Sequence, residues 1–153
     1  MRLSEAEFLT LMGKNEPPSK KKNKYKNKRV YVYSNGLAVE KKIESLGKPV
    51  MVFDSIKEYN RWEELKLLQR GKCISCLRRQ VPIVVSEEYV KDGKTVKAVI
   101  YKADFTYLRG EEKVVEDVKP FDQKTQKYLT TKDFKLKWKI MQGKYPQCTF
   151  ELY

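Results

Sequence analysis

Two aspartates stand on a predicted β-hairpin with a spacing that suits metal-assisted chemistry. Val96–Leu108 and Lys113–Lys119 are both strand-like runs, and Gly110-Glu111 between them suits a two-residue turn with glycine at the position that needs a positive φ. With that turn, Asp104 and Asp117 face each other across the hairpin, with Cβ atoms about 4.5–5.5 Å apart. The sequence therefore predicts a pair of carboxylates side by side on one strand face.

Such a pair predicts a bound cation. Like charges directly opposite each other cost a few tenths to about 1 kcal/mol, and a divalent cation between them removes that cost. Mg²⁺ is suited to this, because it binds through one or two carboxylates and keeps several waters. Lys119 follows Asp117 on the same face, where an ammonium could hold a water nucleophile or neutralise a phosphoryl oxygen. The alternative left open is a surface hairpin with ordinary Asp–Lys pairing.

Strand alternation assigns the neighbours of this pair. Successive side chains on a strand point to opposite faces. Asp104 is therefore expected on one face with Lys102 and Thr106, and Tyr101 and Phe105 are expected on the other.

A third carboxylate lies on a predicted helix over residues 55–70. Ser55 suits the N-cap, and Glu58 three residues later gives the spacing of a capping box. Trp62, Leu65 and Leu68 form the predicted apolar stripe, and Glu58 shares the side of the first two. A carboxylate on the core-facing side needs a partner, which a metal site on the adjacent sheet would supply. Both interpretations of Glu58, helix cap and metal ligand, stay open.

The elements that must position these residues form an α/β pattern. Strand-like runs cover Gln80–Tyr89 and the two halves of the hairpin, with Asp92-Gly93 as the turn after the first run. A second helix is predicted from Thr130 or Thr131 to about Gln142, with a short strand at Cys148–Tyr153. The predicted order from residue 55 on is αβββαβ, which we expect to form a mixed central sheet flanked by helices.

The charge of the chain indicates a polyanionic partner. The 153 residues include 33 Lys+Arg, 20 Asp+Glu and no His, for a net charge of +13. The excess lies in residues 14–29 and 124–144, so we expect phosphate contacts from a basic N-terminal arm and from the last helix. A solvated surface or an anionic membrane is a weaker interpretation. The expected DNA-binding residues are Lys20, Lys21, Lys22, Lys24, Lys26, Lys28, Arg29, Lys132, Lys135 and Lys139.

Composition excludes several classes of protein. Without His there is no Ser-His-Asp or Cys-His nucleophile and no His-ligated zinc enzyme. No apolar run approaches the roughly 20 residues of a membrane span, and the first residues lack the pattern of a signal peptide. The odd number of cysteines, Cys73, Cys76 and Cys148, fits a reducing compartment, so we expect a cytoplasmic protein. Whether these three bind anything stays open.

Taken together, these residues resemble the PD-(D/E)XK nuclease superfamily, and more closely its phage-type branch of Holliday-junction resolvases. The superfamily pattern is a helical Glu, then an Asp, then acid-x-Lys, which Glu58, Asp104 and Asp117-Val118-Lys119 match. The segments that resemble the resolvase branch are KYKNKRV at 24–30, FDSIKEYNRWEELKLLQRG at 53–71, RQVP at 79–82, YKADFTY at 101–107 and VVEDVK at 114–119. Pro120 departs from this branch, in which glycine is expected after the lysine.

The resemblance implies a restriction-endonuclease-like fold and a function. Residues 1–29 would be an N-terminal extension with the basic arm, and residues 30–153 a nuclease domain. Glu58, Asp104 and Asp117 would bind Mg²⁺ or Mn²⁺, with Lys119 assisting the attacking water and Gln80 beside the site. We expect a structure-selective DNA endonuclease, a Holliday-junction resolvase that acts on branched DNA as a homodimer, in the host cytoplasm if phage-encoded.

Two alternatives stay open. One is another DNA nuclease of the superfamily, such as an exonuclease or a transposon-end cutter, and the other is a non-catalytic nucleic-acid-binding protein.

Overall fold

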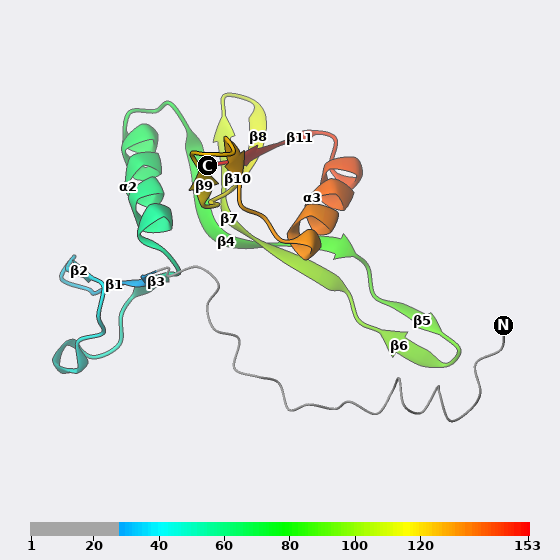
Figure 1. The fold of residues 1–153 in the computed structure, drawn as a ribbon, viewed down its shortest axis with the longest axis horizontal. Coiled ribbons are helices and arrows are strands. Elements are labelled where there is room, and N and C mark those ends of the chain that lie inside the picture. The colour runs from blue at the N-terminus through cyan, green and yellow to red at the C-terminus, as the bar shows by residue number, and fades with distance from the viewer. Residues whose placement is uncertain (1–27) are drawn as a thin grey trace.

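A mixed four-stranded sheet forms the centre of the computed structural model, which describes residues 28–153. The strand order is β11-β8-β7-β4. Strands β4 (Ser75–Ser86), β7 (Val99–Arg109) and β8 (Glu112–Asp117) are antiparallel neighbours, and β11 (Cys148–Leu152) runs parallel to β8. The two helices α2 (Ile56–Arg70) and α3 (Lys132–Lys144) lie on either side of the sheet (Figure 1). The predicted αβββαβ order and the mixed central sheet are confirmed.

The two helices cover opposite faces of the sheet. Val114 packs with Leu65 of α2, whereas its neighbour Val115 packs with Phe134 and Trp138 of α3. Because consecutive strand residues point to opposite faces, the two hydrophobic clusters lie on the two sides of β8. Most of the apolar burial that stabilises the molecule is therefore arranged around this strand, just before the predicted site.

Both predicted helix starts are confirmed by their capping hydrogen bonds. The hydroxyl of Ser55 accepts from the N–H of Glu58 at 3.0 Å, and the hydroxyl of Thr131 accepts from the N–H of Phe134 at 3.1 Å. The predicted stripe of α2 is wrong at one position, because Leu68 is exposed. The helix extends past the edge of the cluster formed around Leu65, so its last turns have little of the sheet to cover.

The hairpin register follows the prediction. The β7–β8 pairs run from Arg109↔Glu112 to Phe105↔Glu116, and Gly110 takes the positive φ of 62° that the two-residue turn requires. Asp104 and Asp117 are the next residues on each strand, where the regular ladder ends. The predicted register is confirmed as far as Phe105↔Glu116, and Asp104 and Asp117 lie just past this last pair, so their direct opposition stays a prediction.

The strict alternation of β7 is interrupted at Asp104. Ala103 packs into the cluster below α3, whereas Phe105, two residues on, packs into the cluster below α2. The interruption coincides with Gln80, the β4 residue opposite Asp104, which has a positive φ of 53°. The expectation that Tyr101 and Phe105 share one face is therefore wrong. The left-handed backbone of Gln80 is accompanied by a local change in strand twist, so the side chains of β7 before and after Asp104 face different helices.

Smaller elements surround this core. A three-stranded sheet of β1 (Val30–Val32), β2 (Ala38–Val39) and β3 (Met51–Phe53), with a 3-10 turn at Glu44–Leu46, packs beside α2. The hairpin of β5 (Tyr89–Lys91) and β6 (Lys94–Val96) extends the β4–β7 ribbon away from the body (Figure 1) and turns at Asp92-Gly93 as predicted. A short hairpin of β9 (Phe121–Asp122) and β10 (Lys127–Tyr128), which the sequence did not predict, follows Pro120.

Part of the predicted basic arm lies outside the described residues. This applies to Lys20, Lys21, Lys22, Lys24 and Lys26. Within residues 28–153, no helix is both long and apolar enough to cross a membrane.

Candidate functional site

Glu58 and Asp104 are brought together by a shared glutamine. The side-chain amide of Gln80 donates to Oε1 of Glu58 at 3.2 Å and to Oδ1 of Asp104 at 3.4 Å. These three residues come from α2, β7 and β4, and the left-handed backbone of Gln80 lies directly opposite Asp104. The other oxygen of Glu58 accepts at 3.1 Å from the N–H of Asp54, the residue before the N-cap Ser55, so Glu58 holds the chain at the start of its helix and also faces the site.

Asp104 also holds the chain where β8 ends. Its Oδ2 accepts from the backbone N–H of Val118 at 2.9 Å. This N–H lies between Asp117 and Lys119, so the carboxylate on β7 draws the acid-x-Lys segment against the site.

Asp117 is held from two sides. It is almost fully buried, accepts a hydrogen bond from the hydroxyl of Tyr101 and forms an ion pair with Lys119. The ammonium of Lys119 lies 4.4 Å from the ring centre of Phe134 on α3, a cation–π contact. The last helix thus supports the lysine, and β7 supports the aspartate.

These groups share one cleft. Its volume is about 380 Å³, and its lining includes Tyr101, Lys102, Asp104, Asp117, Lys119 and Phe134. Glu58 reaches the same group of residues through Gln80. Of the five residues predicted for the site, Asp104, Asp117 and Lys119 therefore line the cleft, and Gln80 and Glu58 are connected to it through Asp104.

The electrostatics of the site favour an added cation. Burial, together with the charge of Asp104, raises the pKa of Glu58 from 4.5 to about 7. Burial also raises the pKa of Asp104 and lowers the pKa of Lys119. The cations near the three carboxylates are Lys119, whose charged form burial disfavours, and Arg79, whose charge acts on Glu58. A divalent ion would relieve this excess of negative charge.

The donor set fits an ion that keeps most of its waters. Among residues 28–153, no three His, Cys, Asp or Glu side chains converge into a ready metal cage. The protein offers carboxylates in pairs, with Gln80 between Glu58 and Asp104. Mg²⁺ is commonly bound by one or two carboxylates with water completing its shell, so the residues fit Mg²⁺ or Mn²⁺.

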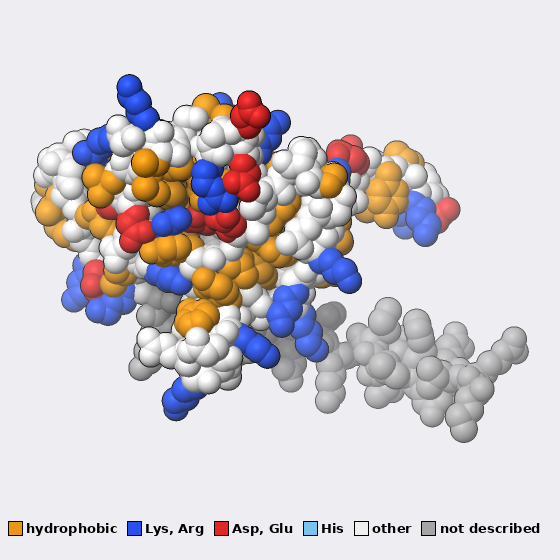
Figure 2. Space-filling view, turned by 90° about the horizontal axis from the view of Figure 1, so that it is seen from above, with side chains coloured by type: hydrophobic (Ala, Val, Ile, Leu, Met, Phe, Trp, Pro, Cys, Tyr) orange, Lys and Arg blue, Asp and Glu red, His pale blue; other side chains and the backbone are white. Residues whose placement is uncertain are grey.

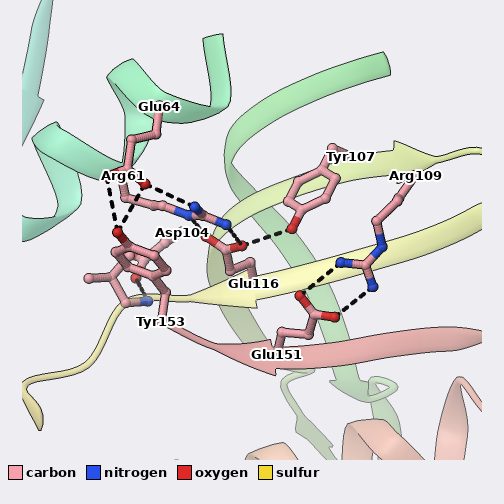
Figure 3. A network of polar contacts seen from close by, with 9 residues as sticks. Arg61, Glu64, Asp104, Tyr107, Arg109, Glu116, Glu151 and Tyr153 are labelled. Atoms are coloured by element: carbon pink, nitrogen blue, oxygen red, sulfur yellow. Dashed lines mark hydrogen bonds and ion pairs between the residues drawn. The ribbon is translucent and has the colours of Figure 1, made fainter. Parts of the chain in front are cut away.

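Three supporting groups were missed by the sequence interpretation. Tyr101 was expected on the wrong strand face, so its contact with Asp117 could not be foreseen. Arg61 donates to both carboxylate oxygens of Glu116 at 2.7 and 2.8 Å (Figure 3). Lys57 donates to the carbonyl of Lys119 at 2.8 Å. In the sequence, Lys57 and Arg61 are marked only by their positions. Lys57 directly precedes Glu58, and Arg61 lies one turn after it.

The predicted DNA-binding residues in the described part are exposed and lie outside the cleft. Lys132, Lys135 and Lys139 are on the solvent side of α3. Lys28 pairs with Glu40 at 2.8 Å, and Arg29 pairs with Asp54 at 3.2 Å. The structure adds Lys102, an exposed residue on the lining of the cleft.

The three cysteines form no disulfide, and Cys76 and Cys148 both line one cavity of about 400 Å³. All of them are free, with Cys73 and Cys76 exposed and Cys148 half-buried. Cys76 and Cys148 lie on β4 and β11, the two outer strands of the central sheet.

Comparison with known proteins assigns the chain to a family. No curated protein and no solved structure matches it. One family model matches residues 22–152, which include every residue of the cleft. The chain therefore belongs to the family described as protein of unknown function (DUF1064).

Proposed function

We propose that this protein is a metal-dependent, structure-selective DNA endonuclease that cleaves four-way junctions as a Holliday-junction resolvase. It would have a PD-(D/E)XK site with Mg²⁺ or Mn²⁺ on a restriction-endonuclease-like core. One observation carries the proposal. Asp104 from β7 and Asp117 and Lys119 from the end of β8 line a single cleft, and Glu58 from α2 is joined to Asp104 through the amide of Gln80. Their order in the chain is that of the superfamily pattern.

Each residue of the site has its own role in the proposed reaction. Asp104 and Asp117, which line the cleft, would hold the metal ion, with Glu58 completing the acidic group through Gln80; the bound ion would supply a Lewis acid and an activated water. Lys119 stabilises negative charge on the phosphoryl oxygens and orients the water. Tyr101 fixes the carboxylate of Asp117, because its phenol is a donor whose pKa burial raises further. Hydrolysis then leaves a 3′-hydroxyl and a 5′-phosphate.

The surface outside the cleft fits a polyanion. Lys132, Lys135 and Lys139 are exposed on α3, the helix whose first turn borders the cleft. Such lysines bind phosphates without reading bases, so selectivity would come from the shape of the junction. A four-way junction has two-fold symmetry, which suits a homodimer. Leu136 and Ile140, 61% and 42% exposed, are an apolar strip that a second copy could cover.

The decisive experiment compares a labelled four-way junction with a linear duplex, with and without Mg²⁺. We expect paired, Mg²⁺-dependent nicks in the junction alone. Asp117→Asn should lower the rate at least about 100-fold, since even residues that only support metal ligands cost 10–100-fold. The matched control is Asp92→Asn in the exposed β5–β6 turn, where asparagine tolerates the positive φ of 50°. Its rate should stay within twofold of the unchanged protein.

The other outcomes separate the alternatives. Cleavage of the linear duplex instead of the junction would make the protein another DNA nuclease of the superfamily. Tight binding of DNA without cleavage in Mg²⁺ or Mn²⁺ would make it a non-catalytic nucleic-acid-binding protein.

A further inference from the structure

We propose that Lys57 is a positioning residue that sets Lys119 for the reaction. This inference rests on the proposed function and adds a residue that the superfamily pattern does not contain. Lys57 directly precedes Glu58 in the first turn of α2. Its ammonium donates at 2.8 Å to the backbone carbonyl of Lys119, which is 62 residues away.

The position of Lys57 is electrostatically unfavourable for a cation. The first turn of a helix carries the positive end of the helix dipole, where Lys is disfavoured. Lys57 is also partly buried, and burial disfavours a charged group. The contacts that offset these costs are the Lys119 carbonyl and two aromatic faces, Tyr128 at 5.4 Å and Tyr153 at 5.2 Å. These contacts therefore hold the ammonium of Lys57 at a defined position against the carbonyl of Lys119.

Lys119 lies past the last β7–β8 pair, so the hairpin does not hold it. Strand β8 ends at Asp117, and the β7–β8 pairs end at Glu116. The N–H of Lys119 donates to the carbonyl of Tyr153 at 3.0 Å, and its carbonyl accepts from Lys57. Both peptide groups of the lysine are thus held from outside the hairpin, one of them by the neighbour of Glu58.

This contact links the two halves of the site. Glu58 and Lys57 are adjacent on α2, so the bond from Lys57 fixes the main chain of Lys119 relative to Glu58. Losing the ammonium should let the end of β8 shift while DNA contacts elsewhere persist. We expect the chemical step to slow and the affinity for DNA to stay.

The test uses Lys57→Met, which keeps an unbranched stem and removes the donor, and Lys57→Arg, which restores one. The control is Lys66→Met on the same helix, where Lys66 forms an ion pair with half-exposed Glu63 at 2.8 Å. Single-turnover cleavage and junction Kd are measured at a temperature where urea unfolding shows every variant folded. A second readout is the ¹³C resonance of the Lys119 carbonyl, which reports its hydrogen bond without depending on activity.

The expected result for Lys57→Met is a rate about 10–100-fold lower, with Kd within about threefold and the Lys119 carbonyl resonance shifted. Lys57→Arg should recover most of the rate, and Lys66→Met all of it. An unchanged rate or an unchanged carbonyl resonance in Lys57→Met overturns the inference, as does an equal loss in Lys57→Arg. If the unchanged protein cleaves no DNA, the proposed function fails and the inference fails with it. If the unchanged protein cleaves and Lys57→Met cleaves equally, only the inference fails.

Discussion

Glu58 shows how one side chain serves both stability and the site. One of its oxygens accepts from the backbone N–H of Asp54 and the other from the amide of Gln80. The helix-cap and site interpretations of the sequence are therefore compatible, because a carboxylate has two oxygens. This position of Glu58 has an electrostatic cost, because burial and the charge of Asp104 both disfavour the charged form of the Glu58 carboxyl.

The raised pKa of Glu58 predicts a loss of stability with pH in the metal-free protein. The folded state holds the proton up to about pH 7, whereas the unfolded state releases it near 4.5. The free energy of unfolding should therefore fall as pH rises from about 4.5 through 7. Glu58→Gln removes this titration, so its stability should change less between pH 5 and pH 8 than that of the unchanged protein.

Urea unfolding at both pH values in EDTA measures this difference. Glu63→Gln, on the exposed side of the same helix, is the control and should keep the original pH dependence. Equal pH dependence in Glu58→Gln and the unchanged protein would contradict the prediction.

At the scale of elements, α2 is tied to β8 by one ion pair that is shielded from solvent. Glu116 is 1% exposed and receives two hydrogen bonds from Arg61 and a third from Tyr107 at 2.8 Å (Figure 3). Arg61 lies one turn after Glu58, and Glu116 directly precedes Asp117. The pair therefore fixes the two elements that carry site carboxylates.

Breaking this pair should be far more costly than breaking a similar pair on the surface. Arg61→Met leaves Glu116 buried without its cation, which typically costs about 3–5 kcal/mol of unfolding free energy. Arg109 binds Glu151 with the same two-pronged geometry at 2.7 and 3.3 Å, but on the surface (Figure 3). Arg109→Met should cost about 1 kcal/mol or less. Urea unfolding of both variants gives the comparison, and equal losses would refute the structural role assigned to Arg61.

At the scale of the whole molecule, charge is unevenly distributed along the chain. On the face shown in Figure 2, Lys and Arg side chains are scattered with Asp and Glu between them. By contrast, residues 14–29 hold eight basic residues and one acid. The segment is expected to supply much of the sequence-independent affinity for DNA.

Neutralising this segment should flatten the salt dependence of DNA binding. Changing Lys20, Lys21, Lys22, Lys24 and Lys26 to Gln removes up to five phosphate contacts, which reduces the magnitude of the slope of log K against log salt by up to about 4.5. The metal site should stay intact, so cleavage at saturating protein should persist. Titrations of a labelled junction at several salt concentrations measure the slope. The same change at Lys41, Lys42 and Lys48, between β2 and β3, is the control, and an equal effect there would argue against a special role for the arm.

The sequence by itself determined the features that depend on neighbouring residues. The helix starts at Ser55 and Thr131 follow from local hydrogen bonds, and the register that places Asp104 by Asp117 follows from the turn at Gly110. Strand spacing also predicted that Asp104, Asp117 and Lys119 share one site, and the helix position of Glu58 pointed toward the same site; the role of these residues in a nuclease came from the resemblance and stays a prediction.

Only the tertiary structure decided which distant groups support the site. Strand alternation predicted Tyr101 away from Asp117, but the left-handed Gln80 on the neighbouring strand interrupts the alternation of β7. The bonds from Arg61 to Glu116 and from Lys57 to Lys119 span 55 and 62 residues. Local spacing carries no information about such partners, because they depend on how a helix packs against a twisted sheet. The residues proposed for the chemistry could be read from the chain, whereas those that hold them in position could be found only in the fold.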